Sequence, residues 1–167
     1  DPTQLRYMCR LGRALRLCGR TEEARVLFEK CLDQCKVSLP ENHPNTLVSL
    51  NNMADVLKQQ GNYEEAAVLY QECHAQAVAT FGEKDRCALG SLNGLAGIHK
   101  CQGHWPQAEA LYRECADGLK AVLGEDDPQT LGSLNDLALV LSSRGSHEEA
   151  RELHQHCLSK RRANLGD

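Results

Sequence analysis

Apolar residues recur along the chain at spacings of three and four residues, the period of one face of an α-helix. In the first such segment they are Leu5, Met8, Leu11 and Leu15, and Gly19 ends the pattern. Thr21 is predicted to cap a second helix, whose apolar face comprises Ala24, Leu27, Phe28, Cys31 and Leu32. The pattern therefore predicts two helices joined by a short turn.

This pair of apolar faces returns along the whole chain at a constant spacing. The turn glycines Gly19, Gly61, Gly103 and Gly145 are 42 residues apart, and so are Ala24, Ala66, Ala108 and Ala150. A fixed period of this length is typical of helical repeat proteins. We expect an all-α solenoid of four helix-turn-helix repeats and eight helices, forming one domain over residues 1–167, with repeats at about 1–41, 42–83, 84–125 and 126–167.

The residues that recur are specific enough to indicate a family. First helices carry Leu-x-x-Leu-Ala, as at Leu92–Ala96, and second helices carry Ala-x-x-x-Tyr-x-x-Cys, as at Ala66–Cys73. This set resembles the tetratricopeptide repeat, whose ordinary period is about 34 residues. The longer period, with Leu50–Ala54 and the join Gly124–Pro128, is similar to the kinesin light chain subfamily. The resemblance implies a right-handed superhelix that binds extended peptides in a concave groove lined by the first helices.

Residues one helical step away from the buried leucine stripe are predicted to line this groove. They include one asparagine per repeat at an equivalent position, namely Asn51, Asn93 and Asn135, whereas the first repeat has Cys9 there. An amide both donates and accepts, so a row of asparagines could pair with the backbone of an extended peptide. The alternative is that each asparagine bonds within its own repeat or to a neighbouring one.

The charge of the predicted lining indicates which kind of ligand the groove would favour. The chain has a net charge of −4 and a sequence pI near 6.0, which argues against a general nucleic-acid-binding function. The predicted lining is nevertheless basic, because Asp55 is set against Arg6, Arg13, Arg16, Lys58 and Lys100. Complementary charge then favours an acidic peptide or acidic C-terminus as the partner. The alternative is a solvated helix face with no ligand.

The nine cysteines do not follow the pattern of a secreted disulfide scaffold, which usually has an even number of cysteines. Four of them, Cys31, Cys73, Cys115 and Cys157, occupy one position of successive second helices. Buried thiols pack as small apolar groups, and we interpret the neighbouring Cys31 and Cys35 in this way rather than as a redox pair. This favours a reducing compartment, and we expect a cytoplasmic protein.

Signals for other functions fail on inspection. Gly90–Gly94 has the wrong residue order for a hydrolase nucleophile turn, and His147–Ala150 is not followed by the second histidine of a zinc-protease helix. His154 and His156 face different sides of a helix. We therefore predict no enzyme activity, no metal and no cofactor, and no apolar run suggests a membrane span.

The sequence predicts a protein-interaction scaffold whose ligand is an extended, acidic peptide. The alternative is a self-assembly module, because neither end of the array has the polar face of a capping helix. Met8 and Leu15 at one end, and Leu153 and Leu158 at the other, could then pair between chains. The chain begins at Asp1 within a repeat frame, so we expect it to be part of a longer protein.

Overall fold

A computed structural model describes residues 2–40 and 43–165, and the described residues form eight helices and no strand. The predicted all-α repeat architecture is thereby confirmed. Residues 1, 41, 42, 166 and 167, where predicted repeats begin or end, lie outside the described residues. The helices are α1 (Pro2–Leu17), α2 (Thr21–Ser38), α3 (Pro44–Gln59), α4 (Tyr63–Phe81), α5 (Arg86–Cys101), α6 (Trp105–Leu123), α7 (Pro128–Ser143) and α8 (His147–Leu165).

The turns within the pairs depend on glycine, as the sequence predicted. Gly19, Gly61, Gly103 and Gly145 all have positive φ angles, between 76° and 88°, which side chains with a β-carbon rarely adopt. In the second repeat the amide of Gly61 donates to the carbonyl of Lys58, and the amide of Asn62 donates to that of Leu57. This pattern ends a helix by satisfying its last carbonyl groups, and it fixes where the chain reverses.

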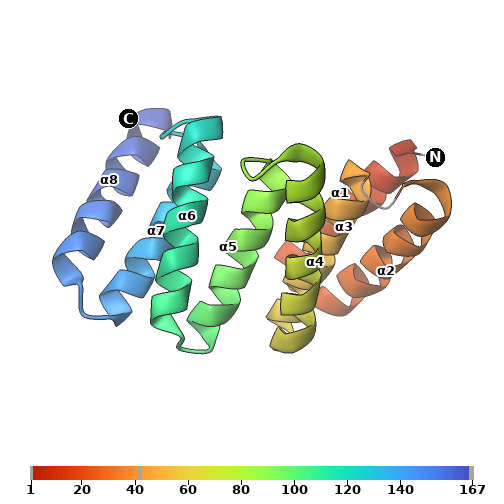
Figure 1. Cartoon of the computed structure of the whole chain (residues 1–167), viewed down its shortest axis with the longest axis horizontal. Coiled ribbons are helices and arrows are strands. Elements are labelled where there is room, and N and C mark those ends of the chain that lie inside the picture. Colours follow the sequence, from red (N-terminus) through yellow and green to blue (C-terminus); the bar gives the residue numbers. More distant parts are fainter. Residues whose placement is uncertain (1, 41–42, 166–167) are drawn as a thin grey trace. The chain divides into compact units, whose positions relative to one another are not determined.

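The chain divides into two compact units, residues 1–94 and 95–167, and the division falls within α5. In the first unit, α1 and α2 form one antiparallel pair and α3 and α4 form the next (Figure 1). The core between α1 and α2 is built from Leu5, Met8, Cys9, Cys31 and Cys35. Ala24 and Phe28 of α2 pack on Val56 of α3, so the first two repeats share one continuous interior.

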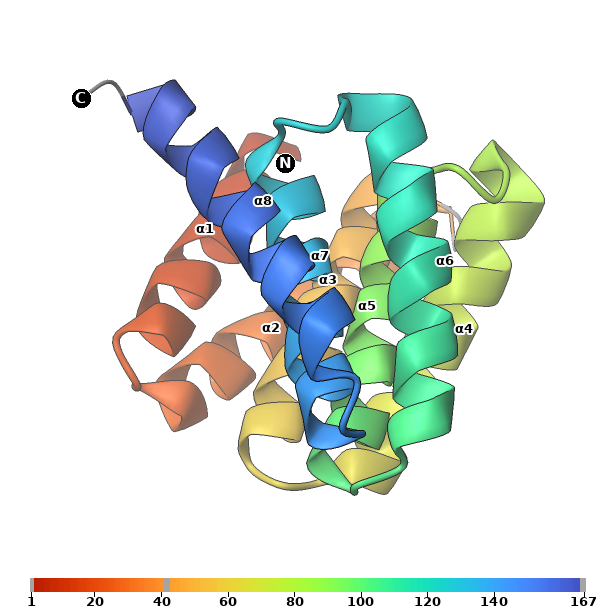
Figure 2. The ribbon, with the colours of Figure 1, turned by 90° about the vertical axis from the view of Figure 1, so that its left-hand side faces the viewer.

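The second unit contains the last part of α5 together with α6, α7 and α8, and Figure 2 shows α8 running alongside α7. Its core joins all four helices and comprises Ala96, Ala108, Tyr112, Leu137, Ala138, Val140, Leu141 and Ala150. None of the helices that the structure describes is long and apolar enough to span a bilayer.

The recurrent cysteines are packed thiols, and each has an exposed fraction of 2% or less. The Cys73 thiol donates to the carbonyl of Leu47 at 3.3 Å, and Cys157 donates to the carbonyl of Leu131 at 3.5 Å. A thiol at this position therefore provides a weak hydrogen bond between the two helices of its repeat. One local prediction is wrong: Thr21 is the first residue of α2, and the cap position falls on Arg20 without a side-chain hydrogen bond.

Candidate peptide-binding surface

All candidate binding residues lie on first helices of the repeats. Within the first unit they are Arg6, Arg13 and Arg16 on α1, Asn51, Asp55 and Lys58 on α3, and Asn93 on α5. Within the second unit they are Lys100 on α5 and Asn135 on α7. Arg6 and Arg13 are exposed, whereas the others are half-buried.

Asp55 is the centre of a polar network in the first unit. Its carboxylate lies 3.5 Å from Nη2 of Arg16 and 3.4 Å from Nζ of Lys58, and it accepts a 2.5 Å hydrogen bond from the Tyr70 hydroxyl. Nζ of Lys58 also lies 5.4 Å from the centroid of the Tyr70 ring, within the range of a cation–π contact. Two of the predicted cations are therefore already paired with an acid of the protein.

Lys100 has an equivalent environment in the second unit. Its Nζ lies 2.6 Å from Asp136 and 5.6 Å from the centroid of the Tyr112 ring. Burial, followed by the nearby Asp136 charge, raises the pKa of Tyr112 well above its ordinary value, so this tyrosine stays neutral. Lys100 is thus a third cation whose charge is balanced internally.

The acid that pairs with the lysine comes from a different helix in each unit. Lys58 pairs with Asp55, one turn earlier on its own helix, whereas Lys100 has Gly97 at that position and pairs with Asp136 of the next first helix. The position of Asp136 is in turn occupied by Gly94 one repeat earlier. The prediction of lining residues from the sequence did not include Asp136, Tyr70 or Tyr112, because it considered each first helix separately.

The two asparagines whose bonds are defined pair within the array. Asn51 donates to the carbonyl of Cys87 at 3.2 Å and accepts from Ser91 at 2.9 Å, which links α3 to the start of α5. Asn135 lies 3.1 Å from Nδ1 of His154 on α8. An amide offers two N–H groups and two lone pairs, so Asn51 retains one of each. The asparagines therefore have a structural role and keep part of their bonding capacity.

Helix α1 is strongly basic. It contains Arg6, Arg10, Arg13 and Arg16 and no acidic residue. Arg6, Arg10 and Arg13 are exposed, and none of them makes an ion pair with the residues that the structure describes. Arg16 is 18% exposed, and its buried Nε has no hydrogen-bond partner among those residues. Most of the uncompensated positive charge of the candidate surface is therefore on one helix.

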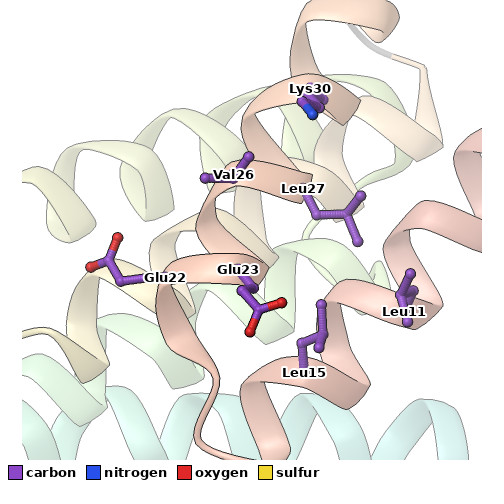
Figure 3. Close-up of a pocket in the computed structure, with 7 residues that line it drawn as sticks. All are labelled: Leu11, Leu15, Glu22, Glu23, Val26, Leu27 and Lys30. Carbon is purple, nitrogen blue, oxygen red and sulfur yellow. The ribbon is translucent and has the colours of Figure 1, made fainter.

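A second feature of the first unit is a pocket between α1 and α2, with a volume of about 380 Å³, whose lining also includes the charged residues Glu22, Glu23 and Lys30. Leu15 and Leu27 point toward each other across it, and Leu11 and Val26 complete its apolar wall (Figure 3). Leu11 and Val26 are 41% and 42% exposed, whereas Leu137, which is equivalent to Leu11 in the fourth repeat, is 3% exposed. The pocket therefore includes, in Leu11, a position whose equivalent is buried in the fourth repeat and half-buried in the second and third.

Within residues 2–40 and 43–165, no three His, Cys, Asp or Glu side chains converge on a possible ion position. All nine cysteines lie in these ranges and are free thiols.

Comparison with known proteins gives consistent results along the chain. The sequence model of the tetratricopeptide repeat matches residues 3–79 and 86–163, whereas no curated protein sequence matches. The crystal structure of BtubC (BKLC) from P. vanneervenii is 20% identical with a TM-score of 0.81, and the match covers 100% of this chain and 67% of that one.

A protein from Podosopora anserina, described as a kinesin light chain with nearly identical TPR-like repeats, is also 20% identical and has a TM-score of 0.64. That match covers 100% of this chain and 99% of the other. A variant of the same protein gives a TM-score of 0.62 at 20% identity, covering 98% and 97% of the two chains. These likenesses confirm the fold and its resemblance to kinesin light chain-like repeats.

Proposed function

Because the chain belongs to the tetratricopeptide repeat family, whose repeats generally mediate protein–protein interaction, we propose that it binds an extended, acidic peptide along α1 and α3. The observation that carries the proposal is the charge of α1, which has four arginines and no acid. Exposed charges of one sign attract a ligand of the other sign and align it on the surface. The ligand we propose is therefore an acidic segment of a partner protein.

The cations of this surface have two different roles in the proposal. Arg6 and Arg13 are exposed and meet the acidic ligand first. Arg16 and Lys58 are held by Asp55, so a ligand carboxylate must compete with that acid for them. The two cations lie at similar distances from Asp55, 3.5 Å for Arg16 and 3.4 Å for Lys58, so a ligand meets the same competition for both. Asp55 thereby restricts binding to ligands that carry enough negative charge to compete with it for Arg16 and Lys58.

The asparagines contribute in a way that does not depend on ligand sequence. Asn51 holds α3 against α5 with one donor and one acceptor, and its remaining N–H and lone pair are available to a peptide backbone. In the second unit, Lys100 and Asn135 hold equivalent positions, but Lys100 is neutralised by Asp136. We therefore expect charge selection mainly on α1, which has four arginines and no acid, rather than at Lys100 of α5.

The test is a titration of fluorescent peptides rich in Asp and Glu, read by anisotropy. We expect the Arg6→Glu, Arg13→Glu variant to bind at least about tenfold more weakly than wild type, because two attractive charges become repulsive. The matched control is Arg161→Glu, Arg162→Glu on α8, which changes net charge equally and leaves the candidate surface intact. Equal weakening in both variants would show that only the net charge of the protein matters.

The salt dependence of the same titration separates specific from unspecific contacts. Binding led by exposed arginines weakens as ionic strength rises, because the Debye length falls to about 8 Å at physiological salt. A neutral peptide of the same length should bind much more weakly at every salt concentration. If acidic and neutral peptides bind equally, the proposal that charge selects the ligand is wrong.

Self-assembly is the second candidate function, and the pocket between α1 and α2 favours it. At the position of the exposed Leu11, the third repeat has the half-buried Leu95 and the fourth has the buried Leu137. A further helix, such as one from a second copy, would therefore find an apolar surface of the kind that repeats use to stack. Light scattering over a concentration series tests this, with Val26→Asp as the disrupting variant. A constant single-chain mass for the wild type would exclude self-assembly.

A further inference from the structure

Two thiols meet in the core of the first repeat. Sγ of Cys9 on α1 lies 3.5 Å from Sγ of Cys31 on α2, and the Ser49 hydroxyl of α3 lies 3.4 Å and 3.2 Å from them respectively. A disulfide bond is about 2.05 Å long, so the sulfur atoms need to approach by roughly 1.5 Å to bond. The first repeat therefore holds two cysteines of different helices almost at bonding distance.

This pair is a departure from the repeat pattern. Cys31 occupies the recurrent thiol position, but Cys9 occupies the position that holds Asn51, Asn93 and Asn135 in the other repeats. In the second repeat the thiol Cys73 donates to a carbonyl at 3.3 Å, whereas the corresponding contact of Cys31 with Leu5 is 3.9 Å long. Cys31 therefore has a longer contact with the carbonyl than Cys73 or Cys157, and a second thiol lies close to it.

We propose that Cys9 and Cys31 form an oxidative modification site, in which a hydroperoxide such as hydrogen peroxide converts the two thiols into a disulfide joining α1 to α2. Cys9 is 8% exposed and Cys31 is fully buried, so the oxidant reaches Cys9 first. Cys31 then acts as the resolving thiol, because its sulfur lies 3.5 Å from that of Cys9.

The reaction is balanced without any group from outside this pair and the oxidant. The Cys9 thiol releases its proton, the thiolate attacks one oxygen of hydrogen peroxide, and the O–O bond breaks. Cys9 becomes a sulfenic acid, and the departing hydroxide takes up the released proton and leaves as water. The Cys31 sulfur then attacks the Cys9 sulfur, the S–O bond breaks, and the proton of Cys31 leaves with the hydroxyl group as a second water. Two thiols are oxidised by two electrons, and one peroxide is reduced to two waters.

The surroundings suit this order of events. The hydrogen bond from Cys31 lowers the pKa of Cys9 to about 7, and the same contact, together with burial, raises the pKa of Cys31. The thiolate is the reactive form of cysteine, so Cys9 is the better nucleophile of the pair. The Ser49 hydroxyl donates to the carbonyl of Asn45 at 2.8 Å. Its hydrogen therefore keeps this partner when both thiols lose their S–H groups.

The site adjoins the surface proposed for peptide binding but does not depend on it. Cys9 lies between Arg6 and Arg13 on α1, so the disulfide would fix the helix that carries these charges. A covalent link between α1 and α2 also reduces the freedom of the unfolded chain. The oxidised protein should therefore unfold at a higher temperature, by at least about 5 °C.

The test uses the folded, fully reduced wild-type chain treated with hydrogen peroxide. The protein is then unfolded in the presence of an alkylating reagent, digested with trypsin and examined by mass spectrometry. We expect the peptide Tyr7–Arg10 to be joined to Cys31–Lys36, with a mass two hydrogens below the sum of the free peptides once the alkyl group on Cys35 is added. Fragmentation must place the link on Cys31 rather than on Cys35, and dithiothreitol must release it.

Variants provide matched controls. Cys9→Ser should abolish the link and the rise in Tm, whereas Cys18→Ser, which removes an exposed thiol of the same helix pair, should change neither. The proposal is overturned if Cys9 and Cys31 are both recovered alkylated after the exposed Cys18 and Cys101 have been oxidised. It is equally overturned if the link joins Cys31 to Cys35 and leaves Cys9 free.

Discussion

Replacing Gly94 by alanine tests whether the Tyr70 ring is locked in place by its hydrogen bond to Asp55. Gly94 is buried in the interior of α5, and a β-carbon there would lie 2.7 Å from Cδ1 of Tyr70 and closer still to Cε1 and Cζ. The ring is 1% exposed, and its hydroxyl donates to Asp55 at 2.5 Å, so it cannot move aside without losing that bond.

The expected magnitude combines two opposing effects. Alanine is favoured over glycine within a helix by roughly 0.5–1 kcal/mol. Overpacking a filled core costs about 1–3 kcal/mol, and loss of a hydrogen bond to a charged group costs about 1.5–3 kcal/mol. The clash outweighs the helix term, so Gly94→Ala should destabilise the fold by about 2 kcal/mol.

Urea unfolding followed by far-ultraviolet circular dichroism measures this effect. The matched control is Gly132→Ala in α7, where a β-carbon meets no atom within 4 Å, and we expect it to stabilise by about 0.5–1 kcal/mol. In a Tyr70→Leu background the clash is removed, and Gly94→Ala should also become stabilising. If Gly94→Ala is as stable as Gly132→Ala, the ring is free to move and the proposed lock does not exist.

Two further predictions concern carboxylates. Asp55→Asn removes the acid that holds Arg16 and Lys58, so acidic peptides should bind several-fold more tightly at low salt, and an unchanged affinity in the peptide titration would contradict the proposed competition. The second prediction concerns Glu109. Burial tends to raise the pKa of Glu109, but hydrogen bonds from Arg144 and Arg113 keep this pKa below its ordinary value. A lowered pKa in the folded state stabilises the protein above the pKa of the unfolded chain, near about 4.3, and this stability is lost as pH falls through the folded value. Glu109→Gln should therefore flatten the fall in Tm on acidification, and an unchanged acid limb would show that Glu109 does not contribute to it.

The fold could be predicted from the sequence because the same pattern occurs four times along the chain. Each repeat has an apolar face of helical period, a turn glycine and a small residue at one fixed spacing. Where one repeat departs from the pattern, the other three still show it. The eight helices and the buried cysteines could therefore be predicted from the pattern. The prediction failed at a purely local detail, the cap at Thr21, where no repetition helped.

The candidate surface was predicted only in part. The sequence places Asn51, Asp55 and Lys58 on one helix face, and the structure has them there. It does not indicate that Asp55 also pairs with Arg16 of the preceding repeat, or that Lys100 pairs with Asp136 of the following one. These partners are 36 or more residues apart, and only the packing of first helices side by side brings them together.

The same limit explains the thiol pair. Sequence spacing favoured Cys31 and Cys35, one turn apart on a helix, as the pair to consider, and Cys9 was only one member of a predicted lining. The tertiary structure brings Cys9 to 3.5 Å from Cys31 because α1 packs on α2 and places both thiols in one buried cluster with Leu5 and Met8. The sequence by itself determined most of the buried positions, since these follow from helical period, but it placed Leu11 on the buried face and Cys9 in the lining, whereas Leu11 is 41% exposed and Cys9 is 8% exposed. Which charges are neutralised and which thiols meet was decided by the packing between helices, because those distances depend on contacts that no local pattern encodes.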